Sequence, residues 1–137
     1  MSEFELHPRL QQDCRVVGDF ALSRLLLMND SQYPWFILVP RRSDIMEIHQ
    51  LAEADRQQLL SESCLLAEKL FELYQPDKLN IAAIGNLVPQ LHVHHVARYR
   101  TDKAWPAPIW GKFAPAPYQE QDAQREIARL RAVLNIG

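Results

Sequence analysis

The stretch of sequence that decides the fold runs from Val88 to Arg98 and reads Val-Pro-Gln-Leu-His-Val-His-His-Val-Ala-Arg. Polar and apolar side chains alternate over Gln-Leu-His-Val-His, which is the pattern of a β-strand whose two faces meet different surroundings. The pattern predicts a strand over residues 91–97. Gln90, His92 and His94 then share one face of the sheet.

Two imidazoles on one strand face suit chemistry on a single substrate group. The unperturbed pKa of histidine is near ~6.5, so its ring can be a neutral nucleophile or a charged donor near neutral pH. His92 and His94 can present adjacent ring nitrogens. His95 points to the opposite face, where we expect it to pack or cap. We expect His7 at the surface and His49 at the entrance to a long helix.

Four further apolar segments are typical of strands: residues 14–19, 23–28, 35–39 and 79–84. Gly18-Asp19 is a turn signal, so the first two segments are expected to form a hairpin. Pro40 closes the third segment, and a Gly85-Asn86 turn follows the fourth.

A long helix over residues 52–74 is the clearest element, and Pro76 ends it. Its apolar residues fall at helical spacing, and we expect this stripe to be core. The stripe contains Leu59, Leu60, Cys64, Leu66, Ala67, Leu70, Phe71 and Tyr74. A short helix over residues 7–14 is expected near the start of the chain, with Pro8 in its first turn. A C-terminal helix over about 118–135 has Ile127, Leu130, Val133 and Leu134 on one face.

The order of strands, helix, strands, helix predicts an α+β domain with an antiparallel sheet of about five strands. The 137 residues fit a single domain, with its core at about 14–100. A loop rich in proline and tryptophan spans 104–117. Its four prolines prevent regular structure, so we expect it to lie extended over the surface.

Composition excludes several classes of protein. The net charge of −2 favours neither nucleic acid nor an acidic membrane, although a local cluster of donors can still bind a nucleotide. No apolar run approaches the ~20 residues of a membrane span, and the first residues do not have the pattern of a signal peptide. Cys14 and Cys64 form no C-x-x-C motif and are expected to be half-buried thiols in a reducing compartment. We therefore predict a cytoplasmic protein.

The histidine segment resembles the signature of the histidine triad (HIT) superfamily, which alternates three histidines with apolar residues. Alignment on Arg98 makes His94 the third histidine and His92 the middle one, with Gln90 in the first place. Residues 34–41, Pro-Trp-Phe-Ile-Leu-Val-Pro-Arg, resemble the family's strand before its long helix. Residues 86–94 and the Trp-Pro-Ala-Pro-Ile-Trp-Gly of 105–111 resemble a bacterial branch of small HIT proteins that lacks the first histidine.

The resemblance implies a HIT-like fold and a nucleotide hydrolase or nucleotidyl transferase. In such proteins the middle histidine, here His92, attacks the α-phosphate and forms a covalent nucleotidyl-histidine, which water or another acceptor releases. The backbone carbonyl at Gln90 would orient His92, and His94 would donate to the phosphate oxygens. The implied partners are a nucleotide or nucleotidyl conjugate and a second copy of the chain, packed through the long helices and adjoining strands. No cofactor is implied.

Other residues are candidates for substrate contact. Asn29 and Asp30 end a strand where the family contacts ribose, and Asn86 belongs to a Gly-Asn turn whose backbone N–H groups could meet phosphate. Arg98 either binds phosphate or pairs with an acidic neighbour. Trp110, like Trp105, either stacks on a base or packs as part of a lid.

Two alternatives remain open. Because Gln90 replaces the first histidine, the chain could be a non-catalytic nucleotide-binding module. Trp35 stands where the family commonly has the histidine that meets the first one, so both members of that pair are replaced. A metal-binding protein that uses His92 and His94 is less favoured, because closed zinc sites require four ligands and no further Cys/His pair is suitably spaced.

Overall fold

Five strands form one antiparallel sheet in the computed structural model, which describes residues 4–136. The strands are β1 (Cys14–Asp19), β2 (Ser23–Met28), β3 (Trp35–Pro40), β4 (Lys78–Ala82) and β5 (Val93–Arg98). Their order across the sheet is β1-β2-β3-β5-β4, and every neighbouring pair is antiparallel. β5 is therefore an inner strand, between β3 and the edge strand β4.

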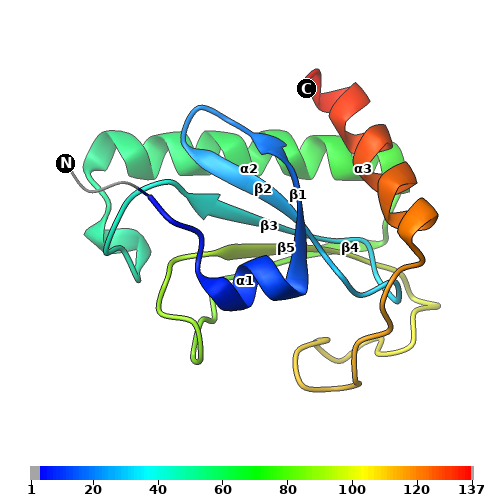
Figure 1. Cartoon of the computed structure of the whole chain (residues 1–137). Helices are drawn as coiled ribbons and strands as arrows, with labels where there is room; N and C mark the ends of the chain where they lie inside the picture. Colours follow the sequence, from blue (N-terminus) through cyan, green and yellow to red (C-terminus); the bar gives the residue numbers. More distant parts are fainter. Residues whose placement is uncertain (1–3, 137) are drawn as a thin grey trace.

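The helices lie on both sides of the sheet. They are α1 (Pro8–Asp13), α2 (Glu53–Tyr74) and α3 (Glu120–Leu134), with a short 3-10 helix η1 (Ile48–Gln50) before α2. Figure 1 shows α2 running across one side of the sheet with α3 next to it, and α1 on the other side. The predicted α+β class, with a long helix and a C-terminal helix, is confirmed. Within residues 4–136, no helix is both long and apolar enough to cross a membrane.

Side chains of β3 alternate between two apolar cores. Phe36 and Leu38 pack with residues of α2 and α3, whereas Trp35, Ile37 and Val39 pack with α1 and the segment after β5. Both faces of the sheet are covered, and every residue of β3 and β5 is buried. Burial on both faces explains why β3 is a continuous apolar run.

Two strand boundaries differ from the sequence prediction. β5 begins at Val93, so His92 lies directly before the strand and not within it. β4 ends at Ala82, two residues earlier than predicted. Residues 83–92 between these strands form neither helix nor strand, and this loop leads directly into His92.

The prediction that the whole apolar stripe of α2 is core is wrong. Leu59, Leu66 and Leu70 are buried, but Leu60 is 66% exposed and Phe71 is 45% exposed. The predicted residues span more than one face of a helix, because adjacent positions are rotated by about 100°. Cys64 is also exposed and not half-buried as predicted, whereas Cys14 is half-buried. On α3, Val133 is only half-buried, and Ala123 joins the buried face.

A buried carboxylate joins α2 to the hairpin of β1 and β2. Glu62 accepts hydrogen bonds from the backbone N–H groups of Leu22 at 2.8 Å and Ser23 at 2.9 Å. Gln58 donates to the same carboxylate at 2.9 Å. These bonds satisfy a charge that would be costly to bury alone, and they fix the helix against the start of β2.

We predict that Glu62→Ala lowers the free energy of unfolding by about 3 kcal/mol, because two buried N–H donors lose their acceptor. Urea unfolding of the variant and the wild type measures the difference. Glu68→Ala, at an exposed position of the same helix, is the matched control and should change stability by less than about 0.5 kcal/mol. Equal losses in the two variants would contradict the role of Glu62.

Candidate active site

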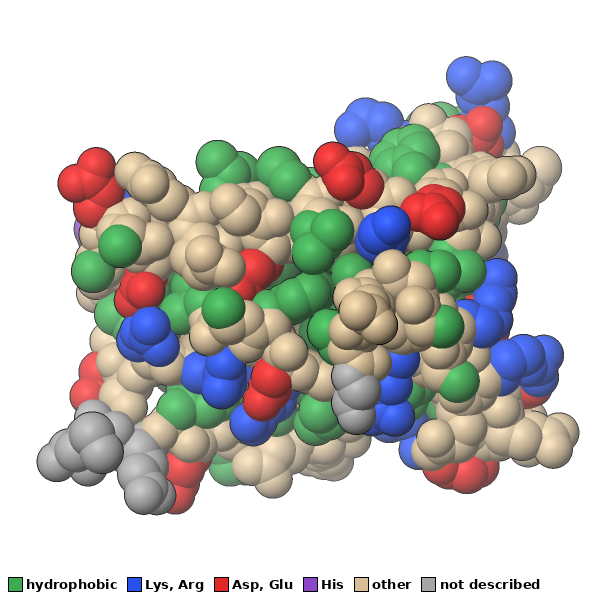
Figure 2. All heavy atoms as spheres, turned by 90° about the horizontal axis from the view of Figure 1, so that it is seen from above, with side chains coloured by type: hydrophobic (Ala, Val, Ile, Leu, Met, Phe, Trp, Pro, Cys, Tyr) green, Lys and Arg blue, Asp and Glu red, His purple; other side chains and the backbone are tan. Residues whose placement is uncertain are grey.

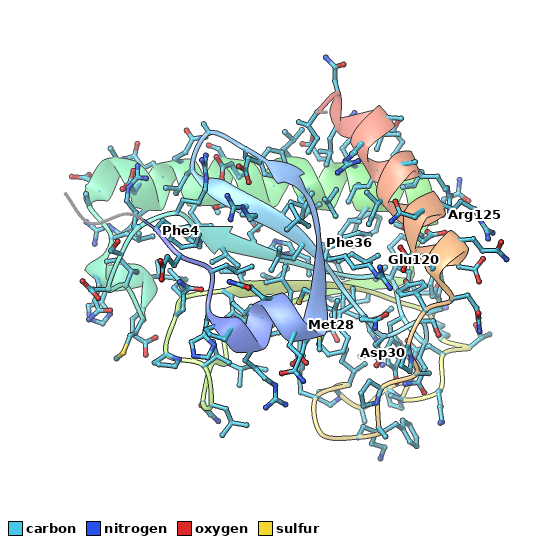
Figure 3. All side chains as sticks on the ribbon, viewed as in Figure 1. Phe4, Met28, Asp30, Phe36, Glu120 and Arg125 are labelled. Carbon is cyan, nitrogen blue, oxygen red and sulfur yellow. The ribbon has the colours of Figure 1, made fainter. Side chains whose placement is uncertain are left out.

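His92 and His94 line a cavity between the end of α1 and the sheet. The cavity has a volume of about 130 Å³, and Arg9, Asp13 and Met28 also contribute to its wall. The same three residues also line a second cavity of about 400 Å³, whose wall includes Trp110 and the end of β2. Figure 3 labels Met28 beside α1, and Asp30 close to the loop before α3. The two cavities share a wall, so one ligand could occupy both.

His92 is held by a backbone carbonyl. Its Nδ1 lies 2.7 Å from the carbonyl oxygen of Gln90, and the ring is only 6% exposed. A carbonyl oxygen can only accept, so Nδ1 carries a proton, and the neutral ring then has its lone pair on Nε2. This is the contact that the family resemblance implies at the middle histidine.

His94 is held by an indole. Trp35 Nε1 lies 3.0 Å from His94 Nδ1, and an indole N–H can only donate. Nδ1 is therefore the acceptor in this pair, which leaves the ring proton on Nε2. Burial of the ring is the largest of the causes that lower the pKa of His94 to about 3, and the charges of His92 and His95 are the others. The ring is neutral at neutral pH.

The side chain of Gln90 points away from both histidines. Its Oε1 accepts from the backbone N–H of His7 at 2.8 Å, and its Nε2 donates to the carbonyl of Glu5 at 2.8 Å. Both halves of the amide are thus used on the N-terminal arm, which we define as residues 4–7. Gln90 therefore contributes its backbone to the site and its side chain to the arm.

His95 lies on the opposite face of the sheet, as the alternation predicts. Its Nδ1 lies 3.1 Å from the carbonyl of Val93, and its Nε2 lies 2.7 Å from the hydroxyl of Ser63 on α2. Burial lowers the pKa of His95 to about 4. His7 is half-buried and not simply a surface residue, because its Nδ1 accepts from the N–H of Arg9 at the start of α1.

The Gly85-Asn86 turn passes close to His92. Gly85 has a φ of 61°, and a Cβ there would lie 3.6 Å from Cε1 of His92 and 3.0 Å from the carbonyl oxygen of Val88. Positive φ and the close approach both require glycine at this position. The side chain of Asn86 is exposed, and its contact with phosphate stays a prediction.

Asn29 and Asp30 line the larger cavity and also hold the loop before α3. Asn29 Oδ1 accepts from the N–H of Tyr118 at 3.0 Å, and Asp30 Oδ1 accepts from the N–H of Ala116 at 3.3 Å. Asp30 is only 3% exposed. Both side chains therefore already have structural partners, and their contact with ribose stays a prediction.

Arg98 has a structural role and does not face the cavities. Its guanidinium forms a two-bond ion pair with Asp102, at 2.8 and 3.1 Å, and donates to Asn80 at 2.8 Å. It is 1% exposed and lies 5.7 Å from the ring of Trp105. Of its two predicted roles, the structure shows the pairing with an acidic neighbour, and contact of Arg98 with phosphate stays a prediction.

The two tryptophans of the proline-rich loop differ in position. Trp110 packs edge-on against His94, with ring centroids 5.5 Å apart, and against Trp35 at 6.4 Å. Trp105 instead covers Arg98. Residues 104–117 form neither helix nor strand, as the prolines predict, and the loop brings only one of its tryptophans to the histidines.

Sequence reasoning missed several residues of the site. Arg9 and Asp13 reach it from α1 and form an ion pair with each other at 2.8 Å. A six-residue helix gives no motif that would have predicted this placement. Trp35 was noted only as the replacement of a family histidine, and nothing in the sequence indicates its bond to His94.

Within residues 4–136, no group of three or more His, Cys, Asp or Glu side chains is arranged to hold a metal ion.

Comparison with known proteins identifies the family. The family model described as the HIT domain matches residues 9–101, so the chain belongs to the HIT-domain family. A histidine triad protein from Marinobacter aquaeolei is 48% identical, with a TM-score of 0.95 over 98% of both chains. One from Bradyrhizobium japonicum is 46% identical, with a TM-score of 0.93 over 96% of this chain and 98% of that one. One from Sinorhizobium meliloti is 40% identical, with a TM-score of 0.92 over 94% and 96%. No curated protein matches the chain.

We predict that the folded protein loses stability in mild acid. The folded-state pKa values of His94 and His95 are lowered to about 3 and about 4 from an ordinary 6.5. Below pH 6.5 the unfolded chain therefore binds protons that the folded chain does not, and stability falls as the pH falls toward 4. Between about pH 7 and about pH 5, each histidine should cost about 2 kcal/mol.

Urea unfolding at the two pH values measures this loss. His95→Gln keeps a polar side chain near Ser63 but does not titrate, so its loss should be about half that of the wild type. His49→Gln, at an exposed position, is the control and should behave like the wild type. Identical pH dependence in His95→Gln and the wild type would show that the buried ring is not responsible.

Proposed function

We propose that the chain is a nucleotide hydrolase or nucleotidyl transferase that acts at the α-phosphate through His92. One observation carries the proposal: the 2.7 Å contact of His92 Nδ1 with the carbonyl of Gln90 leaves Nε2 with a free lone pair on a ring that lines the cavity. A nucleophilic histidine needs this tautomer, and it needs to be held in one orientation.

The reaction has two steps at one phosphorus. The lone pair of His92 Nε2 forms a bond to the α-phosphorus as the bond to the leaving group breaks, and the leaving group departs with the bonding electrons and takes up a proton. Water or another acceptor then attacks the same phosphorus and gives up a proton to the solvent, which balances the proton that the leaving group took up. The phosphorus–nitrogen bond breaks, its electron pair returns to Nε2, and the nucleotidyl group leaves on the acceptor.

His94 stabilises the phosphate during both steps. Its ring centroid lies 5.0 Å from that of His92, and its Nε2 carries a proton because Trp35 occupies Nδ1. A hydrogen bond to a phosphate oxygen is worth most in a site that excludes water. The nucleoside part extends into the larger cavity, where Asn29, Asp30 and Trp110 form part of the wall.

We predict that His92→Ala lowers turnover more than about 10³-fold, because the nucleophile is lost. Adenosine phosphoramidate and dinucleoside polyphosphates are the test substrates. His49→Ala, at an exposed position far from His92 in the sequence, is the control and should retain wild-type turnover. Equal turnover in wild type and His92→Ala, or none with any nucleotidyl conjugate, would overturn the proposal.

A non-catalytic nucleotide-binding module is the second candidate. The observation that favours it is the Gln90 side chain, which is bonded to the N-terminal arm and supplies no titratable group to the site. Reactions with nucleotide labelled at the α-phosphate, quenched with detergent at alkaline pH, separate the two candidates, because the phosphorus–nitrogen bond of the adduct is labile in acid. A labelled adduct on His92 supports the enzyme, whereas saturable binding without an adduct supports the binding module.

The homodimer belongs to the same proposal. Leu60, Cys64 and Phe71 form an exposed line along α2. Ile81 of the edge strand β4 pairs opposite His95, on the side that α2 covers, and it is exposed too. Figure 2 shows hydrophobic side chains at the surface on the side of α2 and α3. An apolar helix face beside an open strand edge is the kind of surface that two-fold pairing covers.

We predict that Leu60→Lys combined with Phe71→Lys converts a dimer into a monomer, because four charges would be buried in a two-fold interface. Sedimentation velocity measures the mass in solution. Met46→Lys replaces an exposed apolar residue of the loop before η1 and should leave the dimer intact. A monomeric wild type, or a double variant that stays dimeric, would contradict this interface.

A further inference from the structure

We infer that Trp35 is a positioning residue for the proposed reaction: its indole N–H fixes His94 as the Nε2–H tautomer, so that His94 is a permanent hydrogen-bond donor beside the lone pair of His92. The inference rests on the proposed function for its consequence in catalysis. The tautomer itself is a property of the protein alone and can be measured without any substrate.

The sheet register brings the two side chains together. Ile37 of β3 pairs directly with His94 of β5, and Trp35 pairs with Val96. Trp35 is two residues from Ile37 and so shares its face, which makes Trp35 and His94 diagonal neighbours. The result is the 3.0 Å contact from Nε1 to Nδ1. Because β3 and β5 are both inner strands, this placement is fixed by the most buried part of the fold.

Surrounding groups protect this hydrogen bond from water. Trp110 packs against both members of the pair, and Trp35 and His94 are both buried. The titratable and charged groups near His94 are His92, His95 and, from α1, Arg9 and Asp13, which line the same cavity. Arg9 and Asp13 form an ion pair with each other. The hydrogen bond from Trp35 therefore decides which nitrogen of His94 is protonated.

The two histidines are therefore held in opposite tautomers. His92 is protonated at Nδ1 by its contact with the carbonyl of Gln90, and His94 is protonated at Nε2 by its contact with Trp35. One ring offers an electron pair and its neighbour offers a proton donor, with centroids 5.0 Å apart. A phosphate group between them meets both at once without any rearrangement of protons.

Tryptophan suits this role because it has no alternative hydrogen-bonding state. An imidazole at residue 35 could donate or accept, so His94 could exchange tautomers with it. The indole removes that freedom. A further consequence is that neutral His94 donates a hydrogen bond but does not deliver a proton, so the leaving group takes its proton from water or from the substrate itself.

Nitrogen NMR of the substrate-free wild type is the first test. Long-range proton–nitrogen correlations identify the protonated nitrogen of each ring. We expect His94 to be entirely in the Nε2–H form and His92 in the Nδ1–H form at about pH 8, where a free histidine is mostly neutral and populates both tautomers. A mixture of tautomers at His94, or protonation at its Nδ1, overturns the inference whether or not the protein is active.

Trp35→Phe is the second test. Phenylalanine keeps an aromatic ring in the core but removes the donor, so His94 should become a mixture of tautomers. Trp110→Phe is the matched control, because Trp110 packs on the same ring without a hydrogen bond to it, and it should leave His94 in the Nε2–H form. If Trp110→Phe gives as much of a mixture of tautomers at His94 as Trp35→Phe does, packing and not the hydrogen bond fixes the tautomer, and the inference is wrong.

Kinetics connect the tautomer to the proposed function. With a nucleotidyl phosphoramidate, Trp35→Phe should lower kcat about tenfold with little change in KM, because one hydrogen bond to the transition state is weakened. An unchanged kcat in a variant with mixed tautomers would overturn the catalytic role of Trp35. Absence of turnover in the wild type would overturn the proposed function but leave the NMR result intact, so the two failures are distinguishable.

Discussion

The position of β5 between β3 and β4 is the constraint on which the rest of the structure depends. Every residue of this strand is buried, so each polar side chain that it carries must find a partner. His95 meets Ser63 on one face, and His94 meets Trp35 on the other. His95 thus joins the sheet to α2, whereas His94 lies in the cavity. The two have different roles because successive side chains of a strand point to opposite faces.

The hydrogen-bond partners of His92 and His94 each have only one hydrogen-bonding role. A carbonyl oxygen can only accept, and an indole N–H can only donate. The Gln90 carbonyl and the Trp35 indole therefore assign different tautomers to two identical rings without any charged residue. Because the assignments are made by backbone and by a buried aromatic residue, salt and solvent have little access to them. The site is arranged before a ligand arrives, which is the condition under which hydrogen bonds contribute most to catalysis.

Much of this fold follows from local patterns, and much of the site does not. Alternation and turn residues predicted the first two strands at their observed bounds, and Pro76 marked the end of α2. The exposed side of α2 was missed because helical spacing alone does not distinguish a core face from a second apolar face. The bond from His7 to Gln90 joins residues 83 positions apart, and the partner of Trp35 depends on strand register. Contacts of that kind arise from topology, which no local pattern contains.

The side chain of Gln90 has a consequence for which residues can replace it. Its amide bonds the N-terminal arm through the backbone N–H of His7 and the backbone carbonyl of Glu5. A side chain that lacks either a donor or an acceptor at residue 90 would leave one of these two backbone groups without its partner. The same residue holds His92 through its own carbonyl. Attachment of the arm and orientation of His92 therefore depend on a single residue, so a disturbance of the arm would reach the cavity through the backbone.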